Sequence, residues 1–139
     1  MNMIEKTSII HTYSNIGENV SVGHFSVVGP NVKIGKNCII HSHVVIDGDT
    51  TIGSGNIIYP FSVIGSKPQH LKYDGEKSKL IIGNNNIIRE HVTMHPGTEI
   101  GIKKTVVGNN GFFMVGSHVA HDCIVCLLYT SDAADEVDS

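Results

Sequence analysis

Isoleucine or valine recurs at every sixth position along the first 64 residues of the chain. The series is unbroken and comprises Ile4, Ile10, Ile16, Val22, Val28, Ile34, Ile40, Ile46, Ile52, Ile58 and Ile64. An α-helix cannot use this period, because six residues at 3.6 per turn rotate the side chain by about 240° and the series would spiral around the helix. The pattern therefore predicts short extended segments separated by turns, with the repeated side chains on one side of each segment.

Three such segments can close into a triangular coil of about 18 residues, and successive coils can stack at the strand spacing of about 4.8 Å. Glycine often follows the apolar position, as in Gly17, Gly23 and Gly35, and asparagine recurs in the same turns. Both residues tolerate the left-handed or tight backbone that corners require. The sequence thus predicts an all-β chain, a parallel β-helix of hexapeptide repeats with Ile and Val stacked inside it.

Two polar segments interrupt the repeat. The apolar spacing resumes at Ile82 and again at Val107, so one excursion covers roughly residues 66–80 and the other roughly residues 96–105. Loops on a rigid scaffold commonly carry binding residues. The count does not place the first excursion on the coil, because Ile64 to Ile82 preserves the period wherever the excursion leaves.

The second excursion brings histidines together if it joins adjacent faces. Met94 to Val119 is then one full turn, and His95 and His121 lie on the same face of successive coils. His118 ends the preceding segment, close to the same corner. We therefore expect a three-histidine cluster beneath two polar loops.

The stretch GSHVAHDCIV places Asp122 directly after His121. A histidine beside a carboxylate suits proton transfer, because an unperturbed imidazole titrates at about 6.5. Three histidines can also hold zinc, as in the β-helical carbonic anhydrases, although their close pair is spaced H-x-x-x-x-H and this one is H-x-x-H. A structural β-helix without an active site is a further interpretation.

Composition narrows the possible functions. The chain has 139 residues, 40% of them hydrophobic, and a formal net charge of −3, which fits one ordinary domain and no nucleic-acid partner. The N-terminus lacks a secretory signal and no apolar run approaches the roughly 18 residues of a transmembrane segment, so we expect a cytoplasmic protein. Cys38, Cys123 and Cys126 are an odd number and are expected to be reduced thiols, and the single C-x-x-C pair is weak support for a redox or zinc site.

From about Ile10 to Val125 the chain resembles the cytosolic UDP-N-acetylglucosamine O-acyltransferases, which catalyse the first step of lipid A synthesis. The resemblance rests on SHVVIDGDTTIG, YPFSVIGSKPQHLKYDGE, IREHVTMHPGT and above all FFMVGSHVAHDC. It implies a left-handed coil, although the general crossover rule favours the right hand. It also implies a homotrimer with sites between subunits. The implied reaction transfers an (R)-3-hydroxyacyl chain from acyl carrier protein to the glucosamine 3-hydroxyl of UDP-N-acetylglucosamine, with no cofactor and no metal.

The resemblance assigns the catalytic roles to two residues. His121 takes the place of the general base and Asp122 that of the acid that orients it. A neutral imidazole can accept the proton of the sugar hydroxyl as this attacks the thioester, and such help typically contributes about 10² to 10⁴ in rate. The carboxylate would hold the tautomer and stabilise the imidazolium, as in hydrolase triads.

The resemblance assigns substrate-binding roles to five further residues. Gln69 and Lys72 match loop positions that contact substrate, and Lys72 could pair with phosphate. His95 and His118 match histidines that line the site. His70 is a departure, because better-known members have aspartate at that place, so the contact expected from a carboxylate is in doubt.

Other members of the fold remain alternatives. The later N-acyltransferase of the same pathway and the nucleotide-sugar acetyltransferases use the same repeat, but the PQHLKYDGE loop favours the O-acyltransferase. Histidines at other corners, such as His11, His24, His41 and His43, are interpreted as solvated or capping corner residues.

The last residues of the chain break the pattern. After Val125 the next turn should open with glycine, but Cys126 stands there and LLYTSDAADEVDS follows without Gly, Asn or Pro. We expect residues 1–125 to form an incomplete β-helix and residues 126–139 to be a non-native or disordered tail. CLLYTSDAADE also looks like the translation of a sequencing-library adapter, which would make this chain an inactive fragment.

Overall fold

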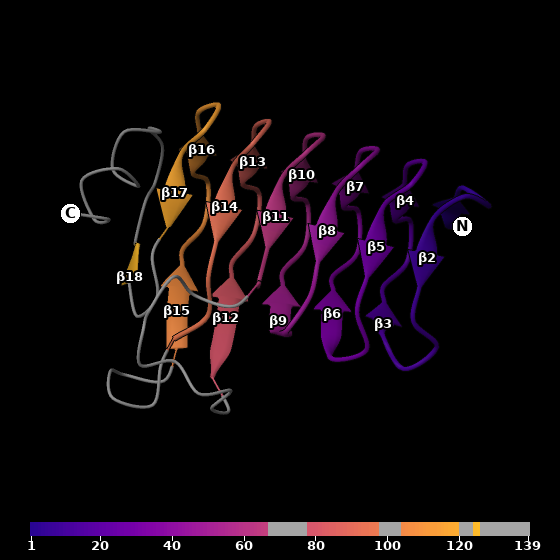
Figure 1. Cartoon of the computed structure of the whole chain (residues 1–139), viewed down its shortest axis with the longest axis horizontal. Helices are drawn as coiled ribbons and strands as arrows, with labels where there is room; N and C mark the ends of the chain where they lie inside the picture. The colour runs from indigo at the N-terminus through magenta and orange to yellow at the C-terminus, as the bar shows by residue number, and fades with distance from the viewer. Residues whose placement is uncertain (67–77, 98–103, 120–123, 126–139) are drawn as a thin grey trace.

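The computed structural model describes residues 1–66, 78–97, 104–119 and 124–125, and every regular element within them is a β-strand. Three parallel sheets run along the molecule (Figure 1). Sheet A consists of β1 (Met3–Ile4), β4 (Ser21–Val22), β7 (Ile39–Ile40), β10 (Ile57–Ile58), β13 (Ile87–Ile88) and β16 (Phe112–Phe113). Sheet B consists of β2 (Ile9–Ile10), β5 (Val27–Val28), β8 (Val45–Ile46), β11 (Val63–Ile64), β14 (Thr93–Met94) and β17 (His118–Val119). Sheet C consists of β3 (Asn15–Ile16), β6 (Val32–Ile34), β9 (Asp49–Ile52), β12 (Lys79–Ile82), β15 (Lys104–Val107) and β18 (Ile124–Val125).

The chain visits the sheets in the order A, B, C and then begins the next coil. Each strand therefore pairs with the strand three places later, as β1 does with β4 and β4 with β7. This confirms the all-β class and the parallel coil of hexapeptide repeats. Among the described residues there is no helix long and apolar enough to cross a membrane.

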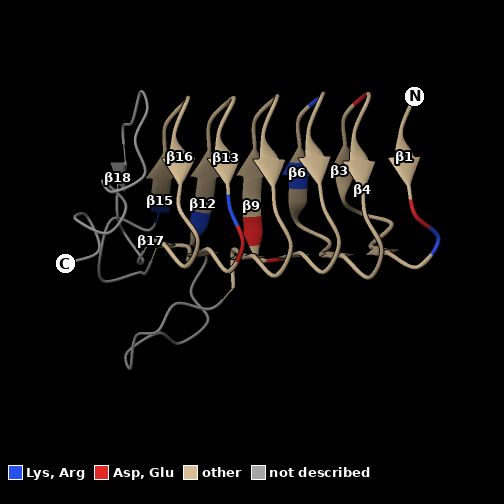
Figure 2. Cartoon of the chain, turned by 90° about the horizontal axis from the view of Figure 1, so that it is seen from above, with Lys and Arg blue, Asp and Glu red and all other residues tan. Residues whose placement is uncertain are grey.

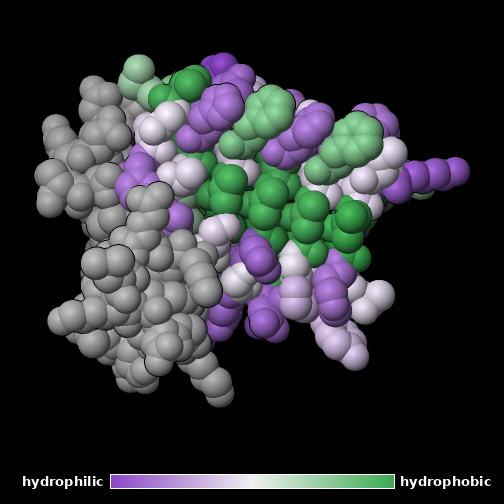
Figure 3. All heavy atoms as spheres, in the orientation of Figure 1, coloured by the Kyte–Doolittle hydropathy of each residue, from purple (hydrophilic) through white to green (hydrophobic). Residues whose placement is uncertain are grey.

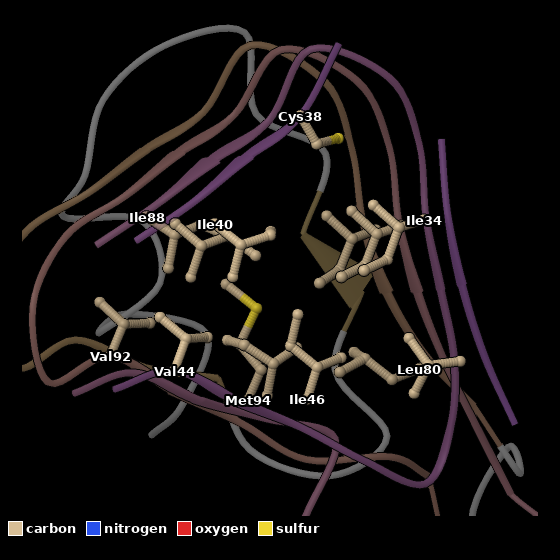
Figure 4. Packing of buried hydrophobic residues seen from close by; sticks show 14 of the residues in the cluster. Ile34, Cys38, Ile40, Val44, Ile46, Leu80, Ile88, Val92 and Met94 are labelled. Atoms are coloured by element: carbon tan, nitrogen blue, oxygen red, sulfur yellow. The ribbon is translucent and has the colours of Figure 1, made fainter. Parts of the chain in front are cut away.

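The six-residue series forms the core of the coil. From Val22 to Ile64 every member is at most 3% exposed, and the later members Ile82, Ile88 and Met94 are equally buried. Figure 4 shows side chains from the three faces pointing toward one another inside the triangle, where like residues stack from coil to coil. Ile4 is 41% exposed, because the first coil has a neighbour on one side only.

Two kinds of constraint explain the corner residues. Asn19 and Asn37 have φ of 57° and 61°, so the predicted left-handed backbone is confirmed at these asparagines. Among the glycines that follow the apolar series, only Gly65 has a positive φ. At Gly23, for example, a Cβ would lie 2.6 Å from the backbone nitrogen of Ser42, so the close approach of the next coil is what requires glycine there.

The register locates both excursions. Ile34 pairs with Ile52, but Ile52 pairs with Ile82 and Ile82 with Val107, so the repeat of 18 becomes 30 and then 25 residues. The extra residues fall between β11 and β12 and between β14 and β15, which are both connections from sheet B to sheet C. The pairing of Met94 with Val119 confirms the predicted full turn.

The outer surfaces of the three sheets differ. Lysines lie on β6, β12 and β15 and an aspartate on β9, so sheet C carries charge (Figure 2). Sheet B instead presents a hydrophobic band (Figure 3), which includes Ile9 and Val27, 66% and 36% exposed. Sheet A also exposes apolar side chains, among them Ile39 and Phe112.

Candidate functional site

The corner between sheets B and C, which we call the B–C corner, carries the candidate site. Ser66 begins the first excursion here, and His95 begins the second directly after β14. The backbone nitrogen of Gly97 donates to the carbonyl of Lys79 at 3.3 Å, so the start of the second excursion is tied to the strand to which the first returns. The described ends of both excursions therefore meet at one place.

His95 is fixed by the backbone of two neighbouring coils. It is 6% exposed, and its own backbone nitrogen donates to the carbonyl of Val119 at 3.1 Å. On the imidazole, Nδ1 lies 3.1 Å from the carbonyl oxygen of Ser66. A carbonyl can only accept, so Nδ1 carries the proton, and in the neutral ring Nε2 holds the basic lone pair.

His118 lies beside His95 on the next coil. It pairs with Thr93 in the parallel ladder, and its Nδ1 lies 2.6 Å from the Thr93 hydroxyl. The two imidazole rings meet edge to face, with centroids 5.0 Å apart and planes at 64°. The sequence predicted His118 at the end of the preceding segment. His118 is instead the first residue of the two-residue strand β17, directly before the buried Val119.

The structure thus brings together two of the predicted site residues, His95 and His118. The others lie outside the described residues: Gln69, His70, Lys72, His121 and Asp122. Sequence reasoning missed Thr93 and the carbonyl of Ser66, which hold the two rings. The sequence did contain a signal for Thr93. Thr93 lies one coil before His118, and the residues at the equivalent position of the earlier coils, such as Val63, are aliphatic.

The other described histidines lie at corners. His24, His41, His43 and His91 lie between sheets A and B, away from the two excursions, and His11 follows β2. Over the residues that the structure describes, no group of three or more His, Cys, Asp or Glu side chains could hold a metal ion. Burial raises the pKa of the Cys38 thiol, which lies inside the coil.

Comparisons with known proteins identify the class and then the family. Residues 13–48 match the bacterial transferase hexapeptide family of six repeats. Together with the triangular coil, this match defines the chain as a hexapeptide-repeat transferase with a left-handed parallel β-helix. Over 120 residues the chain is 51% identical to the UDP-N-acetylglucosamine O-acyltransferase of Rickettsia bellii. The matched region covers 86% of the chain and 43% of that relative. The chain belongs to the UDP-N-acetylglucosamine O-acyltransferase family.

Two further relatives match the chain, one in sequence and one in structure. The corresponding enzyme of Caulobacter vibrioides is 58% identical over 84 residues, which are 60% of this chain and 32% of that protein. The crystal structure of the Moraxella catarrhalis enzyme superposes with a TM-score of 0.86 at 43% identity, covering 88% of this chain and 48% of that one. The chain therefore spans less than half the length of the curated relatives that it matches.

Proposed function

We propose that the protein containing this chain transfers an (R)-3-hydroxyacyl group from acyl carrier protein to the glucosamine 3-hydroxyl of UDP-N-acetylglucosamine, the first step of lipid A synthesis. The names of the relatives specify an acyl carrier protein donor and this nucleotide sugar as acceptor. The observation in this chain that carries the proposal is the His95–His118 pair at the corner from which both excursions leave.

His121 acts as the general base and Asp122 orients it. The neutral imidazole takes the proton of the sugar hydroxyl as the oxygen attacks the thioester carbonyl, and the tetrahedral intermediate expels the carrier thiolate. The imidazolium returns the proton to this thiolate, so the products are the sugar ester and the carrier thiol. No cofactor and no metal ion take part.

The remaining predicted residues bind substrate. His95 and His118 line the pocket, and Gln69 and Lys72 contact the nucleotide sugar from the first excursion, with Lys72 facing a phosphate. His70 stands where better-known members have aspartate, and we propose that its imidazole occupies that subsite.

We also propose a homotrimer in the cytoplasm. A cyclic trimer needs two different patches on each subunit, because each interface joins unlike surfaces. The outward sides of sheets A and B provide two such apolar patches, with Ile39 42% exposed on one and Ile9 66% exposed on the other. Sheet C, which carries the lysines, would face solvent.

The decisive experiment uses a full-length version of the protein. His121→Ala should lower turnover at least about a hundredfold while leaving the affinity for UDP-N-acetylglucosamine, measured by isothermal titration calorimetry, intact. His24→Ala removes an exposed histidine from a different corner and serves as the matched control. Turnover near that of the wild type in His121→Ala would refute the proposed base. The 139-residue chain alone should be inactive, since it spans less than half of its relatives.

A further inference from the structure

The outward row of sheet B changes character along the coil. The residues that pair one after another in this row are Ile9, Val27, Val45, Val63, Thr93 and His118. The first four are aliphatic, and the row becomes polar only on the coils that follow the first excursion. Valine suits this position of the strand at Val63, so the sheet itself does not require the hydroxyl of Thr93.

The Thr93 hydroxyl holds one nitrogen of the His118 ring. The distance of 2.6 Å from Oγ1 to Nδ1 is that of a short hydrogen bond, and both residues are half-buried. With Nδ1 bound to Thr93, the rotation of the ring is fixed and Nε2 points away from Thr93. The edge-to-face contact with His95 supports the ring from a second direction.

The two histidines are held by chemically different groups. The carbonyl of Ser66 can only accept, so it allows His95 one arrangement of its Nδ1 proton. A hydroxyl can donate to a neutral imidazole and accept from an imidazolium, so Thr93 can keep its hydrogen bond when His118 gains a proton. The residue that pairs with His118 is therefore a threonine that can adapt its hydrogen bond, although the strand would also accept a valine at this position.

We propose that Thr93 is a positioning residue of the acyl-transfer site, whose hydroxyl fixes the rotation of the His118 ring and thereby the direction in which Nε2 meets the nucleotide sugar. The inference rests on the function proposed above. Thr93 itself does not contact the reacting atoms.

Kinetics of the full-length enzyme test this role. Thr93→Val removes the hydroxyl but keeps the β-branched shape, and it should raise KM for UDP-N-acetylglucosamine about two- to tenfold, the effect of one lost hydrogen bond, with kcat within about twofold. Thr93→Ser should restore KM. Thr51→Val, an exposed threonine on sheet C, is the matched control and should leave KM unchanged.

A spectroscopic measurement separates positioning from simple packing. In ¹⁵N spectra of the imidazoles, the Nδ1 shift of His118 should be the same in the wild type and in Thr93→Ser, whereas the loss of the hydrogen bond in Thr93→Val should change it. Unchanged His118 shifts in Thr93→Val, or an unchanged KM in that variant when His118→Ala raises KM, would overturn the role of Thr93. If His118→Ala leaves both KM and kcat unchanged, the proposed site is itself wrong and the inference fails with it.

Discussion

The corner between sheets A and B and the corner between sheets B and C belong to the same coils. They differ in how much the length of the connection varies from coil to coil. Every connection from sheet A to sheet B has four residues, from the first coil to the last. Connections from sheet B to sheet C range from two residues, between β8 and β9, to fourteen, between β11 and β12. The B–C corner also carries His95, and both excursions begin there.

The constant corner is stabilised by contacts between coils. Phe25, His43, Phe61 and His91 occupy equivalent positions with φ of 57° to 67°, and their rings form a column with centroids 5.1 to 5.5 Å apart. The last three rings stack, and Phe25 is tilted by 42° against His43. An inserted residue would shift one ring out of this column. The corner between sheets C and A is equally constant, because buried Asn56 and Asn86 bond to each other and to neighbouring carbonyls. The coil can therefore lengthen at one corner without disturbing the other two.

The largest expected effect comes from making the B–C corner as short as the others. Deleting residues 67–77 leaves Gly65, Ser66 and Ser78 between β11 and β12, the same number that joins β5 to β6. In the full-length protein, turnover should fall at least about a hundredfold because Gln69, His70 and Lys72 are removed. The free energy of unfolding should stay constant or rise by about 1 kcal/mol, since a shorter loop costs less entropy. Acyl-transfer assays and urea denaturation measure the two quantities.

The reciprocal variant is the control for this deletion. Placing the same eleven residues between Ser42 and His43 lengthens the constant corner and should break the ring column, so that stability falls. Equal free energies of unfolding for the two variants would show that both corners tolerate a change in loop length equally well.

A smaller effect is expected for the buried amide column. Asn86→Ala removes the acceptor of the Gly111 backbone N–H, which donates to Oδ1 at 2.8 Å, and the donor to the Gly108 carbonyl. An unsatisfied buried group costs about 1–3 kcal/mol, so we expect a loss of about 2–3 kcal/mol in the free energy of unfolding. Asn84→Ala, an exposed asparagine of the same turn, should cost less than about 1 kcal/mol. Similar losses in the two variants would argue against the column.

Most of the fold could be predicted from the sequence, because isoleucine or valine recurs every six residues, at the positions that the coil buries. The series from Val22 to Ile64 predicted the core, and Met94 to Val119 predicted a full turn, both confirmed. The position of the first excursion could not be predicted, because Ile64 to Ile82 spans a multiple of six. Only strand pairing, of Ile52 with Ile82, distinguishes the corners.

The site was less predictable than the fold. His95 and His118 were expected to be neighbours, and they are, but Thr93 was missed because a threonine in a strand is ordinary. The stacked rings were missed for a related reason. The sequence predicts His43 to be a solvated or capping corner residue. Its contacts with the rings of Phe25 and Phe61 can be recognised only when residues 18 apart are aligned coil by coil.

The ring column itself should contribute about as much as one aromatic contact. Phe61 is 52% exposed and stacks on His43 and on His91. Phe61→Leu keeps an apolar side chain at the same positive φ but removes the ring, so the free energy of unfolding should fall by about 1 kcal/mol. The substitution lies outside the B–C corner and should leave KM for the nucleotide sugar unchanged. Undiminished stability would mean that the rings only lie close together.

The smallest effect concerns a half-buried ion pair at the constant corner. Nε of Arg89 donates to Glu90 at 2.9 Å, and this hydrogen bond lowers the pKa of the Glu90 carboxyl from its ordinary value of 4.5. A carboxyl whose pKa is lower in the folded state stabilises the fold above its ordinary pKa, and the contribution is lost as the pH falls through the lowered value. Glu90→Gln should therefore make Tm depend less on pH below about 4.5 and slightly reduce Tm at neutral pH, because an ion pair at the surface contributes little. Arg89→Gln should flatten the curve in the same way, because it removes the partner that lowers the pKa. A Glu90→Gln variant whose Tm falls on acidification as steeply as that of the wild type would rule out the pair as a source of acid sensitivity.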